Sequence, residues 1–259
     1  MKKLRFFFDL IVFVLTARNT GGFGVHSPSL FHLVKFVFAE KNPFYVFAEI
    51  EKLRSELLKN DNTISLRDFG TGIERERKIA EIAKKSLKSK KQAQLLFRIV
   101  NEYKPLNILE LGTSLGITSL YLAASNQNAK CITLEGCPET AKIAISNIEK
   151  LKLSNIEVKI GEIGELLPKV LAEFSELDFV FIDANHTLQA VISYFEQCVE
   201  VINTNSIIVI DDIYWSVEMK KAWKLIKDNI NVSSTIDIFQ MGIVFFNPHL
   251  QKKHYKIVF

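Results

Sequence analysis

Acidic side chains follow two apolar segments of the chain, at the point where each segment stops. Asp183 ends the run Phe179–Ile182, and Asp211 and Asp212 end the run Ile207–Ile210. Like charges that share a cleft repel each other, so such a cluster usually holds a cation or shares a proton. Carboxylate oxygens are hard ligands that suit Mg²⁺, Ca²⁺ or Mn²⁺. The three aspartates are therefore candidate metal ligands, with helix-capping acids that hold no ion as the alternative.

A histidine lies next to the first of these acids. His186 follows Asp183 by three residues, in the sequence Asp-Ala-Asn-His. Neutral imidazole is an effective general base near pH 7, so His186 is a candidate proton acceptor. The alternative is a capping or supporting residue at the start of a helix expected over residues 187–201.

The segment from Leu106 to Gly116 contains a glycine-rich turn. Its apolar residues predict a short buried strand, and Gly112 and Gly116 then open a tight turn before a helix. Such a turn lets a ligand approach bare backbone, and the helix start offers unpaired N–H donors. The spacing Glu-x-Gly-x-x-x-Gly differs from the Gly-x-Gly-x-x-Gly of dinucleotide-binding folds, which disfavours a nicotinamide oxidoreductase.

These residues need a sheet to position them, and the hydrophobic pattern from residue 92 onward predicts one. Strands are expected at 106–111, 130–135, 156–160, 178–183 and 206–210. Helices are expected at 92–102, 116–125, 138–151, 163–174, 187–201 and 217–228. Repeated β–α–β spacing predicts a parallel sheet with helices on both faces, and residues 234–239 and 242–247 predict a closing antiparallel hairpin. Ligands of such sheets bind beyond the carboxyl ends of the strands.

The glycine turn and this layout together resemble the class I S-adenosylmethionine-dependent methyltransferases over about residues 92–259. The resemblance implies a Rossmann-like α/β sheet, S-adenosylmethionine as the cofactor and methyl transfer as the activity. It places the methionine end of the cofactor at the turn, the ribose at Glu135 and the adenine at the 161–163 turn. A carboxylate suits the ribose because its two oxygens accept from both hydroxyls. The implied cofactor-binding residues are Glu110, Gly112, Thr113, Ser114, Gly116, Glu135, Gly161, Glu162, Ile163 and Asp183.

The acidic residues resemble those of the metal-dependent O-methyltransferases of the catechol and caffeoyl-coenzyme A types. Those enzymes carry an Asp at the end of strand four and an Asp-Asn pair after strand five, which Asp183 and Asp211 match. Asp212 departs from the pattern because it stands where the Asn would be. His186 also departs, because it stands where the family has a proton-accepting Lys. The resemblance implies Mg²⁺ at the three aspartates and O-methylation of a hydroxylated small molecule.

Residues 1–91 are interpreted as a Phe-rich and basic helical extension, and residues 92–259 as the methyltransferase domain. Ten of the twenty phenylalanines fall within residues 1–60, where helices are expected at 4–17, 29–40 and 44–59. We expect these aromatic side chains to pack the extension onto the domain. A lid over a hydrophobic acceptor, or a peripheral contact with a membrane surface, is the alternative.

Residues 61–91 are polar and basic. Arg75–Lys78 and Lys84–Lys91 are expected on solvated helix faces, with a phosphate-bearing partner as the alternative. Asp68–Gly72 has the pattern Asp-x-Gly-x-Gly and is interpreted as a turn, with a second cofactor motif as the alternative.

Composition narrows the remaining choices. A net charge of +4 is too small to indicate a nucleic-acid partner, and three cysteines without metal-type spacing fit a reducing, cytoplasmic compartment. The apolar run Phe6–Leu15 is interrupted by Asp9 and is too short to span a bilayer, so we expect an amphipathic or buried helix. The expected acceptor is an aromatic or lipid-like small molecule, and a homodimer is compatible with the sequence. A methyltransferase-fold binding protein without catalysis is the alternative function.

Overall fold

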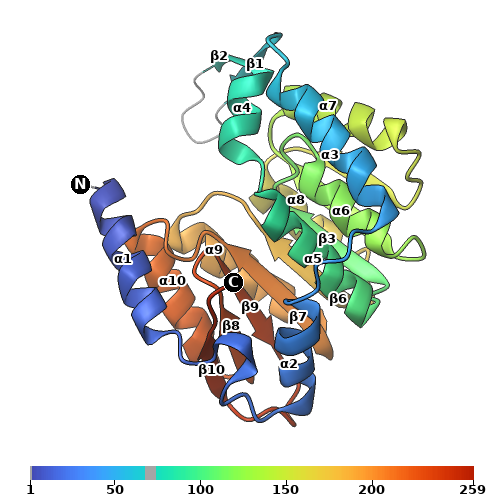
Figure 1. Ribbon diagram of the computed structural model, residues 1–259. Coiled ribbons are helices and arrows are strands. Elements are labelled where there is room, and N and C mark those ends of the chain that lie inside the picture. The colour runs from blue at the N-terminus through green and yellow to red at the C-terminus, as the bar shows by residue number, and fades with distance from the viewer. Residues whose placement is uncertain (1, 68–73) are drawn as a thin grey trace. The chain divides into compact units, whose positions relative to one another are not determined.

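The computed structural model describes residues 2–67 and 74–259 (Figure 1). Contacts between Cα atoms divide the chain into two compact units, Lys41–Val170 and Met1–Glu40 with Leu171–Phe259. None of the helices in the described ranges has the length and the hydropathy that a membrane crossing needs.

The unit Lys41–Val170 is built on three parallel strands. They are β3 (Asn107–Leu111), β4 (Lys130–Glu135) and β5 (Ile156–Ile160). β4 is central, because Ile132 pairs with Leu109 on one side and with Glu157 on the other. β3 and β4 are almost wholly buried, which is why their sequences are apolar on both faces, as is typical of parallel strands.

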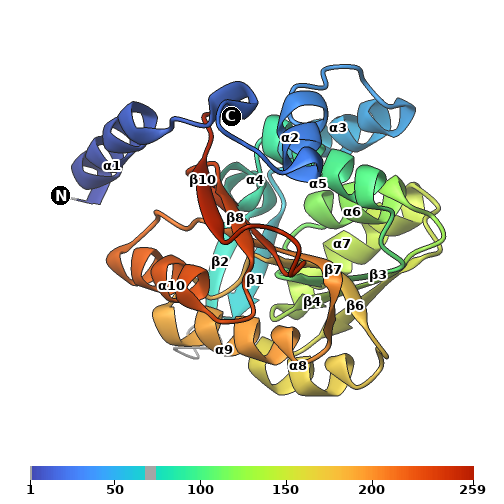
Figure 2. The ribbon, with the colours of Figure 1, turned by 90° about the horizontal axis from the view of Figure 1, so that it is seen from below.

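Helices pack against these strands. Figure 2 shows α5, α6 and α7 on the same side of them. The helices of this unit are α3 (Tyr45–Leu58), α4 (Ile79–Ser86), α5 (Lys90–Tyr103), α6 (Ile117–Ser125), α7 (Pro138–Lys150) and α8 (Ile163–Leu171). α6 packs against β3 and β4, and α7 packs against β4 and β5. Their shared core includes Phe47, Phe97 and Tyr121, whose rings meet at centroid distances of 4.8–6.4 Å. The strands and helices predicted for residues 92–170 are therefore confirmed to within a few residues.

An antiparallel hairpin occupies part of the region where a solvated helix was expected. β1 (Thr63–Arg67) pairs with β2 (Glu74–Lys78), so the helix prediction for Arg75–Lys78 was wrong. The alternation Glu-Arg-Glu-Arg has the period of two that suits a strand, and Ile64 and Leu66 of β1 anchor the hairpin on the unit's core. The Asp68–Gly72 motif lies outside the described residues.

The other unit contains a mixed sheet with the strand order β6-β7-β9-β8-β10. Its strands are β6 (Leu177–Ile182), β7 (Ile202–Asp211), β8 (Ser234–Asp237), β9 (Met241–Phe245) and β10 (Lys253–Lys256). β6 and β7 are parallel, and β9 runs antiparallel to both β7 and β8. The closing hairpin is therefore confirmed, but the sheet continues to β10, which pairs parallel with β8 and was not expected.

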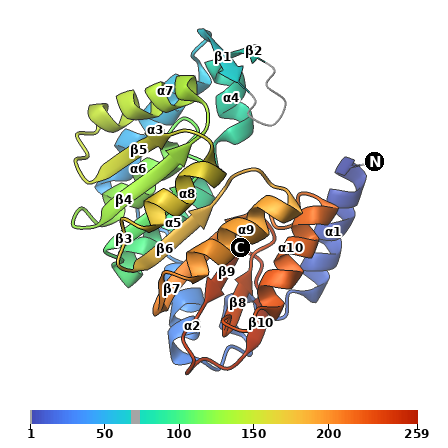
Figure 3. The ribbon, with the colours of Figure 1, turned by 180° about the vertical axis from the view of Figure 1, so that it is seen from behind.

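The helices of this unit bring the N-terminal segment onto the last strands. They are α1 (Lys2–Thr16), η1 (Thr20–Gly22), α2 (Pro28–His32), η2 (Leu33–Val37), α9 (Leu188–Val199) and α10 (Val217–Asp228). α1 lies beside α10 (Figure 3), and Lys220 Nζ is 2.7 Å from Asp9 Oδ2. Phe6 and Phe13 pack their rings against Phe239 at 5.0 and 5.4 Å, which confirms the expected packing role for these two aromatics.

Candidate functional site

The glycine turn follows β3 in the unit Lys41–Val170. Gly112 and Gly116 have φ angles of +103° and +84°, a region that suits glycine. The N–H groups of Gly112 and Thr113 donate to the carbonyl of Leu134 at 2.9 and 3.2 Å, which ties the turn to the end of β4. A Cβ at Gly116 would lie 3.0 Å from Cβ of Ala144, so α6 and α7 can meet only because this residue has no side chain.

Glu135 ends β4 beside this turn. Its Oε2 accepts a 2.6 Å hydrogen bond from the N–H of Ser114, and its Oε1 accepts one of 2.8 Å from the N–H of Cys137. Burial raises the pKa of the Glu135 carboxyl, and these backbone N–H groups oppose that shift by stabilising the anion. A carboxylate fixed by backbone donors has a defined orientation, as a ribose ligand requires.

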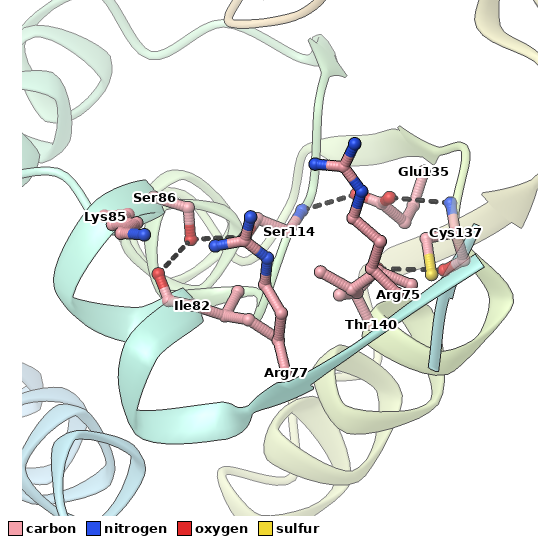
Figure 4. A pocket seen from close by; sticks show the side chains of 10 residues that line it. Arg75, Arg77, Ile82, Lys85, Ser86, Ser114, Glu135, Cys137 and Thr140 are labelled. Carbon is pink, nitrogen blue, oxygen red and sulfur yellow. Dashed lines mark hydrogen bonds between the residues drawn. The ribbon is translucent and has the colours of Figure 1, made fainter. Parts of the chain in front are cut away.

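A cavity of about 410 Å³ contains both features. Its wall includes Arg75, Arg77, Lys85, Ser114, Glu135 and Cys137 (Figure 4). Ser114 also meets Ser86 of α4, with 2.8 Å between their Oγ atoms. The volume falls within the range of small-molecule and cofactor sites.

The other cofactor residues of this unit lie around β4 and β5. Glu110 is fully buried and accepts hydrogen bonds from the hydroxyls of Thr133, at 2.7 Å, and Ser119. Gly161 follows β5 and donates its N–H to the Glu135 carbonyl at 2.9 Å, so the 161–163 turn and Glu135 adjoin. Glu162 caps α8 by accepting from the N–H of Glu165 at 2.7 Å. Glu110 is thus placed to hold the strands together, rather than in the cavity wall.

Asp183 and His186 belong to the other unit, in the loop after β6. His186 Nε2 is 3.4 Å from Asp183 Oδ1. Asn185 and His186 both have positive φ angles, +59° and +31°, which are unusual for residues with side chains. The Asn185 amide donates to the Tyr194 hydroxyl at 2.6 Å, and this contact holds the loop.

A second cavity, of about 530 Å³, opens beside this loop. His186, Tyr214 and Trp215 line it, together with Arg5, Phe6 and Asp9 of α1. The N-terminal helix thus contributes a wall to the cavity that contains His186.

Asp211 ends β7 in the same unit, and Asp212 follows it directly. Asp211 is buried and pairs in register with Met241, whereas Asp212 has a φ of +53° and turns the chain away from the strand. Among the residues that the structure describes, no group of three or more His, Cys, Asp or Glu side chains is arranged to hold a metal ion.

Residues 109–213, which contain the glycine turn and all four acidic positions after the strands, match a family model described as a methyltransferase domain. This segment is therefore similar to methyltransferase domains. Curated relatives include a catechol O-methyltransferase of Niastella koreensis, 33% identical over 110 residues, which are 41% of this chain and 49% of the relative. The O-methyltransferase imqG of Aspergillus flavus is 31% identical over 130 residues, 48% of this chain and 51% of the relative. The chain spans about half the length of these relatives.

Solved structures of methyltransferases share the fold. An O-methyltransferase from Bacillus cereus in complex with SAH superimposes with a TM-score of 0.58 at 21% identity, over 80% of this chain and 93% of that one. An SAH-bound methyltransferase of Podospora anserina gives 0.57 at 15% identity, over 80% and 99%. The Rossmann-like fold and the resemblance to class I methyltransferases, both predicted from the sequence, are confirmed.

Part of the wall of the cavity that contains Ser114 and Glu135 was not predicted from the sequence. Arg75, Arg77, Lys85 and Ser86 precede residue 92 and were assigned to a solvated surface. The period-two alternation of Arg75 and Arg77 with glutamates was the signal that could have placed both arginines on one face of a strand.

Proposed function

We propose that the chain is an S-adenosylmethionine-dependent methyltransferase that methylates a hydroxyl oxygen of a small molecule. One observation carries the proposal: the cavity of the unit Lys41–Val170 is lined both by Ser114 of the glycine turn and by Glu135 at the end of β4. The names of two relatives support the O-methyltransferase class: one is a catechol O-methyltransferase, and the other is an O-methyltransferase.

The cofactor's three parts match three places in this unit. The glycine turn takes the methionine end, Glu135 accepts from the ribose hydroxyls, and the 161–163 turn lies against the adenine. The hydrogen bond from Gly161 to the Glu135 carbonyl supports the last assignment, because it makes the ribose and adenine positions neighbours, as they are in the cofactor.

The transfer step is a displacement at the methyl carbon. An oxygen lone pair of the acceptor forms the new C–O bond, the C–S bond breaks, and its electrons return to sulfur as the neutral thioether. Positioning the two reactants supplies much of the rate. The acceptor's proton passes to His186 Nδ1, because Nε2 is the atom turned to Asp183. The resulting imidazolium is then stabilised by the adjacent carboxylate.

Mg²⁺ at Asp183, Asp211 and Asp212 remains a proposal; among the described residues no group of three or more His, Cys, Asp or Glu side chains is arranged to hold an ion, so no step is routed through a metal. The magnesium prediction has a direct test. Turnover measured with Mg²⁺ and with a chelator should differ if the metal prediction holds, and equal turnover would reject it.

The acceptor is proposed to be aromatic. The cavity that contains His186 is also lined by Phe6, Tyr214 and Trp215, which supply flat apolar surface.

Part of α1 outside this cavity is apolar and exposed, including Phe7 at 60% and Phe8 at 64%, which supports a peripheral contact with a membrane surface as a separate proposal.

The test is turnover with a panel of catechols and phenolic acids. Purified protein, S-adenosylmethionine and each acceptor are incubated, and S-adenosylhomocysteine and the methyl ether are quantified by mass spectrometry. The variant His186→Gln should lower kcat while cofactor affinity stays within twofold. Cofactor binding without turnover on any acceptor would favour the binding-protein alternative.

A further inference from the structure

The β1–β2 hairpin sorts its charged residues onto two faces. Arg75 pairs with Leu66 and Arg77 pairs with Ile64, so these four side chains share one face of the hairpin. Ile64 and Leu66 pack against the hydrophobic core of the unit. The arginines therefore lie on the face that is turned toward the protein, although a surface strand usually keeps its charges on the solvent side.

The opposite face contains Glu76 and Lys78. Glu76 pairs with Ser65 and Lys78 pairs with Thr63, one register position away from the arginines. Lys78 forms an ion pair with Asp61 at 3.0 Å, and both side chains are largely exposed. Lys78 thus offers a cation on the same strand that does not line the cavity.

Both arginines extend from β2 into the cavity that contains Ser114 and Glu135 (Figure 4). Among the described residues of the wall, Lys85 and the two arginines are cationic, and Glu135 supplies the one carboxylate. Among the hydrogen bonds and ion pairs between described residues, none reaches the guanidinium group of Arg75 or Arg77. This excess of positive charge in the wall favours a ligand that has an anionic group.

We propose that Arg75 and Arg77 bind the carboxylate at the amino-acid end of the cofactor. The inference rests on the proposed function, since it assumes S-adenosylmethionine in this cavity. The carboxylate is the one anionic group of that cofactor, and the turn at Ser114, which takes the methionine end, is part of the same cavity wall. A guanidinium matches a carboxylate with two parallel N–H···O bonds, which gives orientation as well as affinity.

The hairpin therefore acts as a specificity element that requires the complete amino-acid end of the cofactor. A nucleoside thioether without that end, such as 5′-methylthioadenosine, should bind independently of the arginines. Loss of a charge-assisted contact to a carboxylate should weaken S-adenosylhomocysteine by about 10- to 100-fold.

The test is isothermal titration calorimetry with S-adenosylhomocysteine and with 5′-methylthioadenosine. The proteins are the full chain and the variants Arg75→Gln, Arg77→Gln, the double variant and Lys78→Gln, the last removing an equal charge from the outer face. Melting temperatures identify any variant that fails to fold, and Arg75→Lys with Arg77→Lys then replaces it, because lysine keeps the charge without the fork.

We expect the double variant to lose affinity for S-adenosylhomocysteine but to stay within twofold for methylthioadenosine, with Lys78→Gln unchanged for both. Equal losses for both ligands would overturn the proposal, as would unchanged affinity for S-adenosylhomocysteine. If the unaltered chain binds neither ligand, the proposed function itself fails, which separates that failure from an error in the arginine assignment.

Discussion

The backbone N–H of Ser114 donates a 2.6 Å hydrogen bond to Oε2 of Glu135. This contact joins the turn after β3 to the last residue of β4, two segments separated by the whole of α6. It needs Ser114 in a left-handed conformation, with a φ of +49°. The turn therefore aims an N–H group at the carboxylate, and the two proposed cofactor contacts have a fixed relative position.

Replacing Glu135 by Gln should weaken cofactor binding by about 1–3 kcal/mol, because the ribose hydroxyls then meet a neutral amide with one acceptor oxygen instead of a charged carboxylate with two. Calorimetry with S-adenosylhomocysteine measures the effect. The conservative change keeps the side chain's size, so that the loss reports the charge. Unchanged affinity would reject the ribose assignment.

The same variant has a pH-dependent effect on stability. Burial raises the pKa of Glu135, so the folded state holds this proton to higher pH than the unfolded chain does. The stability that this group contributes is therefore greatest at low pH and falls as the pH rises above its ordinary value of 4.5. The free energy of unfolding of the unaltered chain, relative to Glu135→Gln, should decrease from pH 4 to pH 8 in urea titrations. A difference that is constant with pH would contradict this.

Replacing Gly116 by Ala should lower the free energy of unfolding by more than about 2 kcal/mol. The φ of +84° is costly for alanine, and the new Cβ would lie 3.0 and 3.1 Å from Cβ and Cα of Ala144. Urea denaturation gives the magnitude. Gly164→Ala is the matched control, because its new methyl group would meet only the carboxylate of Glu162, at 3.1 Å, and should cost less than the change at Gly116. Equal effects of the two changes would show that the close packing at Gly116 is not limiting.

Of the three cysteines, Cys137 should react first with a thiol reagent at pH 8. Burial raises the pKa of Cys198 to about 12 and raises that of Cys131, so both stay protonated. Cys137 lines the cavity beside Glu135. The rate of reaction with 5,5′-dithiobis(2-nitrobenzoate) should fall when S-adenosylhomocysteine is present, and Cys137→Ser should remove the fast phase. Labelling that is equally fast with and without the ligand would place the cofactor elsewhere.

Breaking the ion pair between Asp9 and Lys220 should loosen α1. The two side chains are 18% and 29% exposed, and Lys220 Nζ approaches both carboxylate oxygens, at 2.7 and 2.9 Å. A double-mutant cycle with Asp9→Asn and Lys220→Met should give a coupling energy of about 1 kcal/mol. Hydrogen exchange along α1 should rise in Asp9→Asn but not in Lys221→Met, which alters an exposed neighbour on α10. Unaltered exchange would mean that the other contacts of α1, such as those of Phe6 and Phe13 with Phe239, are sufficient to hold the helix.

The sequence by itself determined the alternating strands and helices from residue 92 onward, the glycine turn and the acid at the end of β4. These features depend on local periodicity and on residues close in the chain, such as Gly112 and Gly116, whose conformations follow from their lack of a side chain. The family match at residues 109–213 agrees with these predictions.

Only the tertiary structure decided where Arg75 and Arg77 lie. A strand of alternating Glu and Arg has no apolar face of its own, so its position depends on pairing with Ile64 and Leu66, which bury themselves in a core built by distant helices. The parallel pairing of β10 with β8 is likewise nonlocal. Electrostatic and packing contacts between segments far apart in sequence fix these placements, and no pattern within a single segment encodes them.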